Sequence, residues 1–510
     1  MYEAVVIGCG PVGALTANLL GVRGVRTLVV ERSAEPHGQP RAFSCDDEAL
    51  RIFQQAGLRE EVERDTYPPR RAEYVNARGR VFAEIALDEI DFGLGAKPLH
   101  FFDQPRLEAA LRRGLARFPH VTLRTNTEVT GLTGHDDHVT VTLREDGRAT
   151  EVDTRYVLGA DGARSTTRVA AGIALRGASD TERWLAVSGD VQPGGTRVDA
   201  TRFVCDWRRP AFVSPGAFGT HRLEFMLLDG EDPEAMTSPA AIRRLVAPYV
   251  DPDRFAVTRA VVYAFHHLVA DRWRDGRVFL LGDAAHQMPP FLGQGLCSGL
   301  RDAANLTWRL AQVLRGDAED ALLDGYEAER RPHAEEMALT SVRLGRVFLV
   351  RNRVAAAARD VALRAVQAVP RVRRAIRHFE FKPRPALPGH RGTVGTMFPQ
   401  PDVAVEGRRV PLDDVLGAEF AVVGPGVDAV TALTWRGPVA RFARVVPAGS
   451  GAAGDITTVE DVDGTLCAWF AAHGADVVVL RPDRFVHAVG TGPAVSWTGS
   501  AEASGEAARR

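Results

Sequence analysis

Cysteine is scarce in this chain of 510 residues. The five cysteines form an odd set without a Cys-x-x-Cys pair, so neither a disulfide framework nor a zinc site is indicated. A low cysteine content fits a reducing compartment. We therefore expect a cytoplasmic protein without a metal site.

Lysine is scarcer still, because Lys97 and Lys382 are the only lysines among 63 basic residues. The 65 acidic residues balance the basic ones, and the formal net charge is −2. A chain so nearly neutral has no overall field that would attract nucleic acid or an acidic membrane. We predict no nucleic-acid partner.

Uncharged runs long enough to cross a membrane are also rare. The run from Ala4 to Val22 has that length, but it contains four glycines and one proline, and Glu3 stands where a signal peptide needs basic residues. We predict a buried strand, a tight turn and a helix here, and no integral membrane segment.

The remaining composition is typical of a globular protein. Apolar residues make up 45% of the chain and charged residues 25%, a balance that allows a large core. At about 150 residues per domain, the length predicts roughly three domains.

The N-terminal residues predict the start of a doubly wound α/β sheet. Residues 2–8 form an apolar, β-branched run, 8–13 a glycine-rich turn, 14–21 a helix and 27–30 a second strand that ends at Glu31. Such a β-α-β unit opens a Rossmann-like domain.

Later segments predict further units. Alternating apolar and polar residues between 184 and 265 favour a second, antiparallel sheet. The segment 381–392, rich in proline, glycine and basic residues, is typical of a linker, and strands and a helix follow it. The Ser-, Ala-, Gly- and Glu-rich tail at 491–510 is predicted to be disordered.

A dinucleotide-binding motif occupies the first turn. Gly8-Cys9-Gly10-Pro11-Val12-Gly13 fits GxGxxG between a strand and a helix, where the first glycine allows the turn, the second lets a pyrophosphate approach and the third allows close packing. Glu31 follows Gly10 by 21 residues, as a ribose-binding acid does. This motif alone does not separate NAD from FAD.

Two further motifs make that separation. Residues 277–283 form an apolar strand that ends in Gly282-Asp283 and is followed by Ala284-Ala285-His286, by a Pro-Pro turn and by Gly293-Gln294-Gly295 before a helix. An aspartate there can accept hydrogen bonds from a polyol such as the ribityl chain of a flavin, and the helix start can face the ring edge that becomes negative on reduction. Residues 156–165 add an Asp161-Gly162 turn.

Together these motifs resemble the single-component FAD-dependent aromatic hydroxylases, which have the p-hydroxybenzoate hydroxylase fold. Four other segments resemble the 3-(3-hydroxyphenyl)propionate/3-hydroxycinnamate hydroxylase branch: residues 40–50, 222–226, 381–383 and 481–485. One departure is Leu296-Cys297, where the family commonly has x-Asn after GQG, so a side-chain amide near the flavin is absent.

The resemblance implies an architecture of three domains. It is an α/β protein with a Rossmann-like FAD-binding domain over 1–180 and 266–380. An antiparallel-sheet substrate domain is inserted over 181–265, with contributions from about 70–105, and a thioredoxin-like domain covers 393–490. Because that last domain lacks Cys-x-x-Cys, we expect it to have a structural or assembly role.

The resemblance also implies which residues hold FAD. They come from both glycine motifs and from the segments between them: Gly8, Gly10, Pro11, Val12, Gly13, Glu31, Arg32, Arg41, Gln104, Asp161, Gly162, Gly282, Asp283, Ala284, Gly293 and Gly295. The catalytic residues stay unassigned. Pro290 and His286 are candidates on the substrate side, and a packed histidine is the alternative for His286.

The activity implied by the resemblance is hydroxylation of a phenolic ring ortho to its hydroxyl. NADH or NADPH is the expected reductant of FAD, O₂ the oxygen donor and a small aromatic molecule the substrate, with an arginine to pair with a substrate carboxylate. Two alternatives stay open: a tailoring hydroxylase for an aromatic polyketide or antibiotic, and a flavin-binding protein without catalysis. A homodimer is compatible with the sequence.

Overall fold

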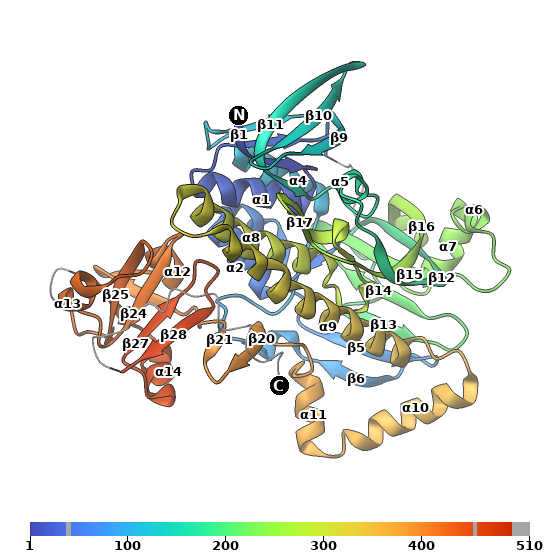
Figure 1. The fold of residues 1–510 in the computed structure, drawn as a ribbon. Helices are drawn as coiled ribbons and strands as arrows, with labels where there is room; N and C mark the ends of the chain where they lie inside the picture. The colour runs from blue at the N-terminus through green and yellow to red at the C-terminus, as the bar shows by residue number, and fades with distance from the viewer. Residues whose placement is uncertain (37–41, 452–455, 492–510) are drawn as a thin grey trace, which may run out of the picture.

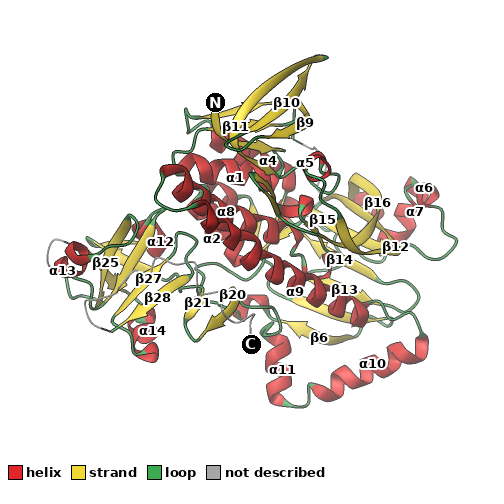
Figure 2. Ribbon diagram, viewed as in Figure 1, coloured by secondary structure: helices red, strands yellow, loops and turns green. Residues whose placement is uncertain are grey.

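The computed structural model describes residues 1–36, 42–451 and 456–491. Within these ranges the chain is a mixed α/β protein in which three large sheets are joined by helices (Figures 1 and 2). Arg41 and residues 492–510 of the predicted tail lie outside the described residues. None of the described helices is both long enough and apolar enough to cross a bilayer.

The first sheet contains the N-terminal β-α-β unit. The parallel strand β1 lies between β11 and β2, and the sheet runs in the order β17-β18-β11-β1-β2-β8, with β9 and β10 as an antiparallel extension of β11. Its strands are β1 (Tyr2–Ile7), β2 (Thr27–Val30), β8 (Val121–Arg124), β9 (Glu128–Gly134), β10 (Val139–Glu145), β11 (Arg148–Gly159), β17 (Arg274–Asp275) and β18 (Val278–Leu280).

Three helices cover this sheet and carry much of the core. α1 (Pro11–Val22) packs between α4 (Gln104–Leu115) and α8 (Gly295–Arg315). The closest approach of α1 and α8 is at glycine, because a Cβ on Gly299 would lie 2.6 Å from Cγ2 of Val12. Both ligand-facing turns are thereby fixed to the same pair of helices.

The second sheet is mostly antiparallel and runs β19-β16-β12-β15-β14-β13-β5-β6. Its apolar positions pack under α7, and the opposite positions face the first sheet. The members are β5 (Ala72–Asn76), β6 (Val81–Ile85), β12 (Leu175–Val191), β13 (Thr201–Cys205), β14 (Ala211–Pro215), β15 (Thr220–Met226), β16 (Phe255–Ala270) and β19 (His286–Gln287). The predicted second sheet is confirmed, and strands from residues 72–85 join it.

The C-terminal unit, orange to red in Figure 1, has its own sheet in the order β23-β22-β26-β25-β24-β27-β28. Its elements are β22 (Asp402–Val405), β23 (Arg408–Pro411), α12 (Leu412–Leu416), β24 (Phe420–Gly424), α13 (Ala429–Thr434), β25 (Ala440–Pro447), β26 (Thr457–Asp461), α14 (Thr465–His473), β27 (Val477–Leu480) and β28 (Val486–Gly490). The predicted linker is partly structured, because Ala386–Arg391 forms β20 and pairs with β21 (Val394–Thr396).

The remaining elements connect these sheets. The helices are α2 (Asp47–Gln55), α3 (Arg59–Arg64), α5 (Thr166–Ala170), α6 (Pro233–Met236), α7 (Pro239–Val246), α9 (Asp324–Phe348), α10 (Arg353–Val366) and α11 (Pro370–Arg377). The short strands are β3 (Ser44–Cys45), β4 (Thr66–Tyr67) and β7 (His100–Phe102), and the 3₁₀ turns are η1 (Leu87–Glu89), η2 (Ala217–Gly219), η3 (Pro252–Arg254), η4 (Gly282–Ala284), η5 (Pro290–Leu292) and η6 (Asp320–Leu323).

Candidate active site

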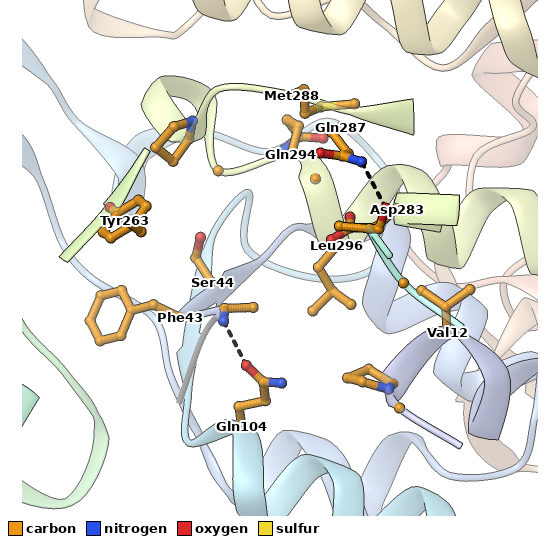
Figure 3. Close-up of a pocket in the computed structure, with 18 of the residues that line it drawn as sticks. Val12, Phe43, Ser44, Gln104, Tyr263, Asp283, Gln287, Met288, Gln294 and Leu296 are labelled. Carbon is orange, nitrogen blue, oxygen red and sulfur yellow. Dashed lines mark hydrogen bonds between the residues drawn. The ribbon is translucent and has the colours of Figure 1, made fainter. Parts of the chain in front are cut away.

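A cavity of about 790 Å³ lies between the first and the second sheet. Residues from the N-terminal glycine turn line one part of it, the turn after β18 lines the middle, and the second sheet forms its floor. Gly10 and Asp283 both border this cavity, so the two sequence motifs converge. In Figure 3, Val12 and Asp283 lie on one side of the cavity, Tyr263 and Phe43 lie on the other, and Ser44 lies between them.

The glycines of the first turn differ in the space around them. At Gly8, φ is +96°, and a Cβ at Gly13 would lie 2.0 Å from the carbonyl oxygen of Gly8. Both positions therefore require glycine for the backbone itself. A Cβ at Gly10 would meet nothing within 4 Å. The room over Gly10 is thus available to a ligand that approaches the backbone.

Glu31 lies at the end of β2 beside this turn. Its Oε2 accepts a hydrogen bond from the amide of Cys9 at 2.8 Å, and its Oε1 accepts one from the amide of Ser33 at 2.9 Å. Arg32 and Gln104 also line the cavity. Gln104 Oε1 accepts a hydrogen bond from the amide of Ala42 at 2.6 Å, as Figure 3 shows. The Glu31 carboxylate thus fixes the shape of the turn.

Asp161 follows β11 at the carboxyl edge of the sheet. Its Oδ2 accepts hydrogen bonds from the amide and the hydroxyl of Thr167, both at 2.9 Å. Its Oδ1 is buried and has no hydrogen-bond partner among the described residues. A buried acceptor without a donor is costly, so a ligand that donates to Oδ1 would complete this site. The adjacent Gly162, at φ +80°, also lines the cavity.

The second glycine motif follows β18. Asp283, in η4, is exposed and lines the cavity, whereas its neighbours Gly282 and Ala284 are buried behind it. Gly293, at φ +66°, and Gly295 line the cavity where α8 begins. The first amides of this 21-residue helix therefore face the cavity, where they favour negative charge.

Cys297, which replaces the family's asparagine, is buried in the first turn of α8 and does not line the cavity. Burial raises the pKa of its thiol to about 12. The side chain therefore stays a neutral thiol, so it adds no charge beside the helix start.

The two substrate-side candidates have different surroundings. Pro290 lines the cavity at the start of η5. His286 is not among the lining residues and is only 2% exposed. Its Nε2 lies 2.7 Å from Oδ2 of Asp302, and its ring packs against Trp273. This placement fits the alternative of a packed histidine.

The floor of the cavity contains charged residues that the sequence did not single out for a role. Cross-strand pairing aligns Phe212, Glu224, Ala186 and Val261 in one row, and Ser214, Arg222, Ser188 and Arg259 in the next. Aromatic side chains surround them: Tyr74, Trp184, Phe203, Tyr263, Phe265, Phe291 and Phe348. The only signal for Arg222 and Glu224 was the segment 222–226, which carried the resemblance.

Comparison with known families matches both parts of the chain. Residues 1–341 match the FAD binding domain model, and residues 395–501 match the HcaD C-terminal domain. A curated relative from Burkholderia cenocepacia (strain HI2424), named 3-(3-hydroxy-phenyl)propionate/3-hydroxycinnamic acid hydroxylase, is 41% identical over 95% of this chain and 93% of its own length. A relative of the same name from Mycobacterium sp. (strain JLS) is 39% identical over 95% and 88%. The chain belongs to the FAD-dependent aromatic hydroxylases.

Solved structures of flavin-dependent hydroxylases share the fold of this FAD-dependent aromatic hydroxylase. The flavin-dependent monooxygenase PieE, in complex with FAD and substrate, has a TM-score of 0.77 at 23% identity over 96% of both chains. The p-nitrophenol 4-monooxygenase PnpA from Pseudomonas putida DLL-E4 has a TM-score of 0.68 at 26% identity and covers 75% of this chain and 98% of its own. The cavity between the glycine turns thus occurs in a fold that holds FAD.

Proposed function

We propose that this hydroxylase oxidises 3-(3-hydroxyphenyl)propionate to 2,3-dihydroxyphenylpropionate, with FAD as cofactor and NADH or NADPH as reductant. The observation that carries the proposal is the 41% identity to the Burkholderia cenocepacia relative, which extends over 95% of this chain. A single cavity that joins the glycine turns to an aromatic floor supports it.

FAD fits the residues present along that cavity. In this proposal Gly8, Gly10 and Gly13, with Pro11 and Val12, form the cradle of the pyrophosphate, and Glu31 binds the adenosine ribose. The other contributors are Arg32, Gln104, Asp161, Gly162, Asp283, Gly293 and Gly295, which line the cavity. Gly282 and Ala284 would support Asp283 from behind, and Arg41, also in the proposed set, lies outside the described residues. The open space over Gly10 and the unpartnered Oδ1 of Asp161 support this set.

The floor of the cavity fits an aromatic acid. Its charged lining residues include two guanidinium groups, of Arg222 and Arg259, and one carboxylate, of Glu224. Arg222 Nε donates to Glu224 Oε1 at 2.8 Å. We assign Arg259 to the substrate carboxylate, because a planar guanidinium can form two parallel hydrogen bonds with one. Pro290 and Phe291 would border the ring. A neutral polyketide has no carboxylate for such a pair.

FAD, once reduced, supplies the electrons that activate O₂ for transfer of one oxygen atom to the ring. The part of this chain is to hold the ring between aromatic side chains, to exclude water and to handle the phenolic proton.

The C-terminal unit does not take part in this redox chemistry in our proposal. Its parallel pair β24–β25 and antiparallel hairpin β27–β28 support a thioredoxin-like fold, and Cys467 is its only cysteine.

The test is a substrate panel with purified protein. We expect yellow protein whose NAD(P)H oxidation and oxygen uptake are stimulated by 3-(3-hydroxyphenyl)propionate, with a product 16 mass units heavier, the mass of one oxygen atom. Arg259→Gln should raise KM for this acid by 10-fold or more, while the KM for 3-methylphenol, which has no carboxylate, stays the same. Protein that takes up no FAD, or that oxidises NAD(P)H equally without substrate, would contradict the proposal.

A further inference from the structure

Arg222, Glu224 and Tyr263 form a hydrogen-bonded cluster on the floor of the cavity. Tyr263 Oη donates to Glu224 Oε2 at 2.6 Å, and Arg222 Nε donates to Glu224 Oε1 at 2.8 Å. The Glu224 carboxylate therefore joins the other two side chains. All three side chains line the cavity.

These bonds determine what the Tyr263 hydroxyl can offer to a ligand. Its proton is donated to Glu224, and its oxygen lone pairs can accept hydrogen bonds. Burial raises the pKa of Tyr263 well above its ordinary value, and the Glu224 charge raises it further, so the hydroxyl keeps its proton. While that proton is shared with Glu224, the Tyr263 oxygen can accept a hydrogen bond from a ligand but cannot donate one.

Within the cluster, Tyr263 lies toward the cofactor end of the floor. β16 runs from Arg259 past Tyr263 to Val269, which pairs with His286 next to η4. At about 3.3 Å per residue, Tyr263 is roughly 13 Å closer to that end than Arg259 is. An acid held by Arg259 would therefore extend its ring and its phenolic hydroxyl toward Tyr263.

Few other titratable groups face the cluster. Among the described residues that line the cavity from this sheet, Glu224 is the only carboxylate. β12 and β14 place Ala186, Ser188 and Phe212 against it; the remaining titratable lining groups of the sheet are Arg259 and His266 on β16 and Tyr74 on β5.

We propose that Glu224 is the acceptor of the phenolic proton during hydroxylation and that Tyr263 carries the proton to it. This rests on the proposed function. The phenolic O–H bond breaks as a new O–H bond forms on Tyr263, while the original O–H bond of Tyr263 breaks and its proton binds Glu224 Oε2. The phenol becomes a phenolate and the carboxylate becomes an acid, with no change of oxidation state, and the proton returns by the same route to the product.

The advantage of this relay is that it accepts the phenolic proton only when the substrate ring has become acidic. A phenol with a pKa of about 10 gives its proton to a carboxylate only unfavourably in the ground state. The ring becomes far more acidic as it loses electron density to the incoming oxygen, so an acceptor two hydrogen bonds away is needed only then.

The experiment compares Tyr263→Phe and Glu224→Gln with the wild type between pH 6 and 10. Each variant keeps the shape of its side chain but interrupts proton transfer. We expect the rate of catechol formation to fall by about 100-fold or more at pH 7, the scale of acid–base catalysis. The deficit should shrink toward pH 10, where the free phenol ionises unaided. Tyr249→Phe is the matched control, because Tyr249 is partly buried in the same domain and does not line the cavity.

A binding measurement separates this role from simple support of the fold. 3-Phenylpropionate, which lacks the hydroxyl, should perturb the flavin absorbance of both variants with an affinity within 3-fold of wild type. A deficit that is the same at every pH, lost 3-phenylpropionate binding, or a rate within 3-fold of wild type at pH 7 would each overturn the relay. Should one variant fail to retain flavin, the other decides. A wild type without catechol product would instead refute the proposed function.

Discussion

At the scale of single residues, the glycines of the N-terminal turn have different roles. Gly13 is required by the backbone itself, whereas Gly10 leaves space for a ligand. Gly13→Ala places a Cβ 2.0 Å from the Gly8 carbonyl, whereas Gly10→Ala meets no atom of the chain within 4 Å. We expect Gly13→Ala to lower both the melting temperature of the apoprotein and FAD binding. Gly10→Ala should leave the apoprotein melting temperature unchanged and weaken FAD binding by 10-fold or more. Equal apoprotein losses in both variants, measured by thermal melts and FAD titration, would contradict this.

A second residue-scale feature is a buried cluster of charges beside the cavity. Asp46 Oδ2 accepts hydrogen bonds from Arg301 at 2.5 Å and from Lys382 at 3.0 Å, and Arg301 also donates to Glu48 at 2.7 Å. Arg301 further donates to the cavity-lining Gln294 at 3.0 Å. The cluster therefore ties α2 and the segment after α11 to the start of α8.

Asp47 is the exception in this cluster. Burial raises its pKa to about 6, and the negative charges of Asp46 and Glu48 contribute. A carboxyl with a higher pKa in the folded chain holds its proton more tightly there, so its stabilising contribution is complete below about pH 4 and is lost as the pH rises through 6. Asp47→Asn should therefore raise the free energy of unfolding by about 3 kcal/mol at pH 7 and above and change nothing below about pH 4.

The neighbouring Asp46 should behave in the opposite way. Asp46→Asn leaves two buried cations with fewer counterions, and we expect a loss of about 3 kcal/mol at pH 7. Urea unfolding of Asp46→Asn and Asp47→Asn from pH 4 to 8 checks both signs. A destabilised Asp47→Asn at pH 8 would contradict the raised pKa.

What the sequence could predict at this scale depends on separation along the chain. The glycine turns and Asp283 form local patterns that are legible over a few residues. Lys382 and Asp46 are 336 residues apart, and Glu224 meets Tyr263 across 39 residues. No short sequence pattern predicts these contacts, because they depend on how distant segments of the chain pack together.

At the scale of elements, apolar runs predicted the buried strands and helices well. The run at 27–30 is β2, and the helix expected after the Gly293-Gln294-Gly295 turn is α8. The strands β13, β14, β22 and β23 were not predicted individually, because they are short and partly exposed and so carry little periodicity. The resemblance predicted that residues from about 70–105 contribute to the substrate domain, which the composition of that segment alone could not have shown.

The close packing of α1 against α8 predicts that a helix residue outside the cavity affects FAD binding. Gly299 does not line the cavity, but a Cβ there would lie 2.6 Å from Val12 and 3.1 Å from the Cα of Gly282. Gly299→Ala should push apart the two turns and weaken FAD binding at least 10-fold. Gly134→Ala, whose Cβ meets nothing within 4 Å, is the control and should bind FAD as the wild type does. Unchanged flavin affinity in Gly299→Ala would show that the turns move independently of the helices.

At the scale of the whole molecule, the C-terminal unit is joined to the FAD-binding part through buried charges. Arg51 of α2 donates to both carboxylate oxygens of Asp413, at 2.7 and 3.0 Å, and to the carbonyl of Phe398 at 2.6 Å. Trp308 and Glu329, from α8 and α9, are hydrogen-bonded to Asp483 and Arg481. α8, which begins at the second glycine turn, therefore has one face inside this interface.

Because of these contacts, we expect the C-terminal unit and the FAD-binding part to unfold together. Arg51→Ala removes three hydrogen bonds of a guanidinium that is 1% exposed, and it should cost about 3 kcal/mol, as the loss of one partner of a buried ion pair does. Arg315→Ala breaks a pair with Glu419 across the same interface, but that pair is about one-third exposed at 3.4 Å and should cost less than about 1 kcal/mol. Calorimetry with flavin release followed in parallel would check this: the wild type and Arg315→Ala should show one coincident transition, and Arg51→Ala an earlier one. Equal shifts for the two variants would mean that the interface charges do not couple the units, and flavin retention would then depend on the FAD-binding part alone.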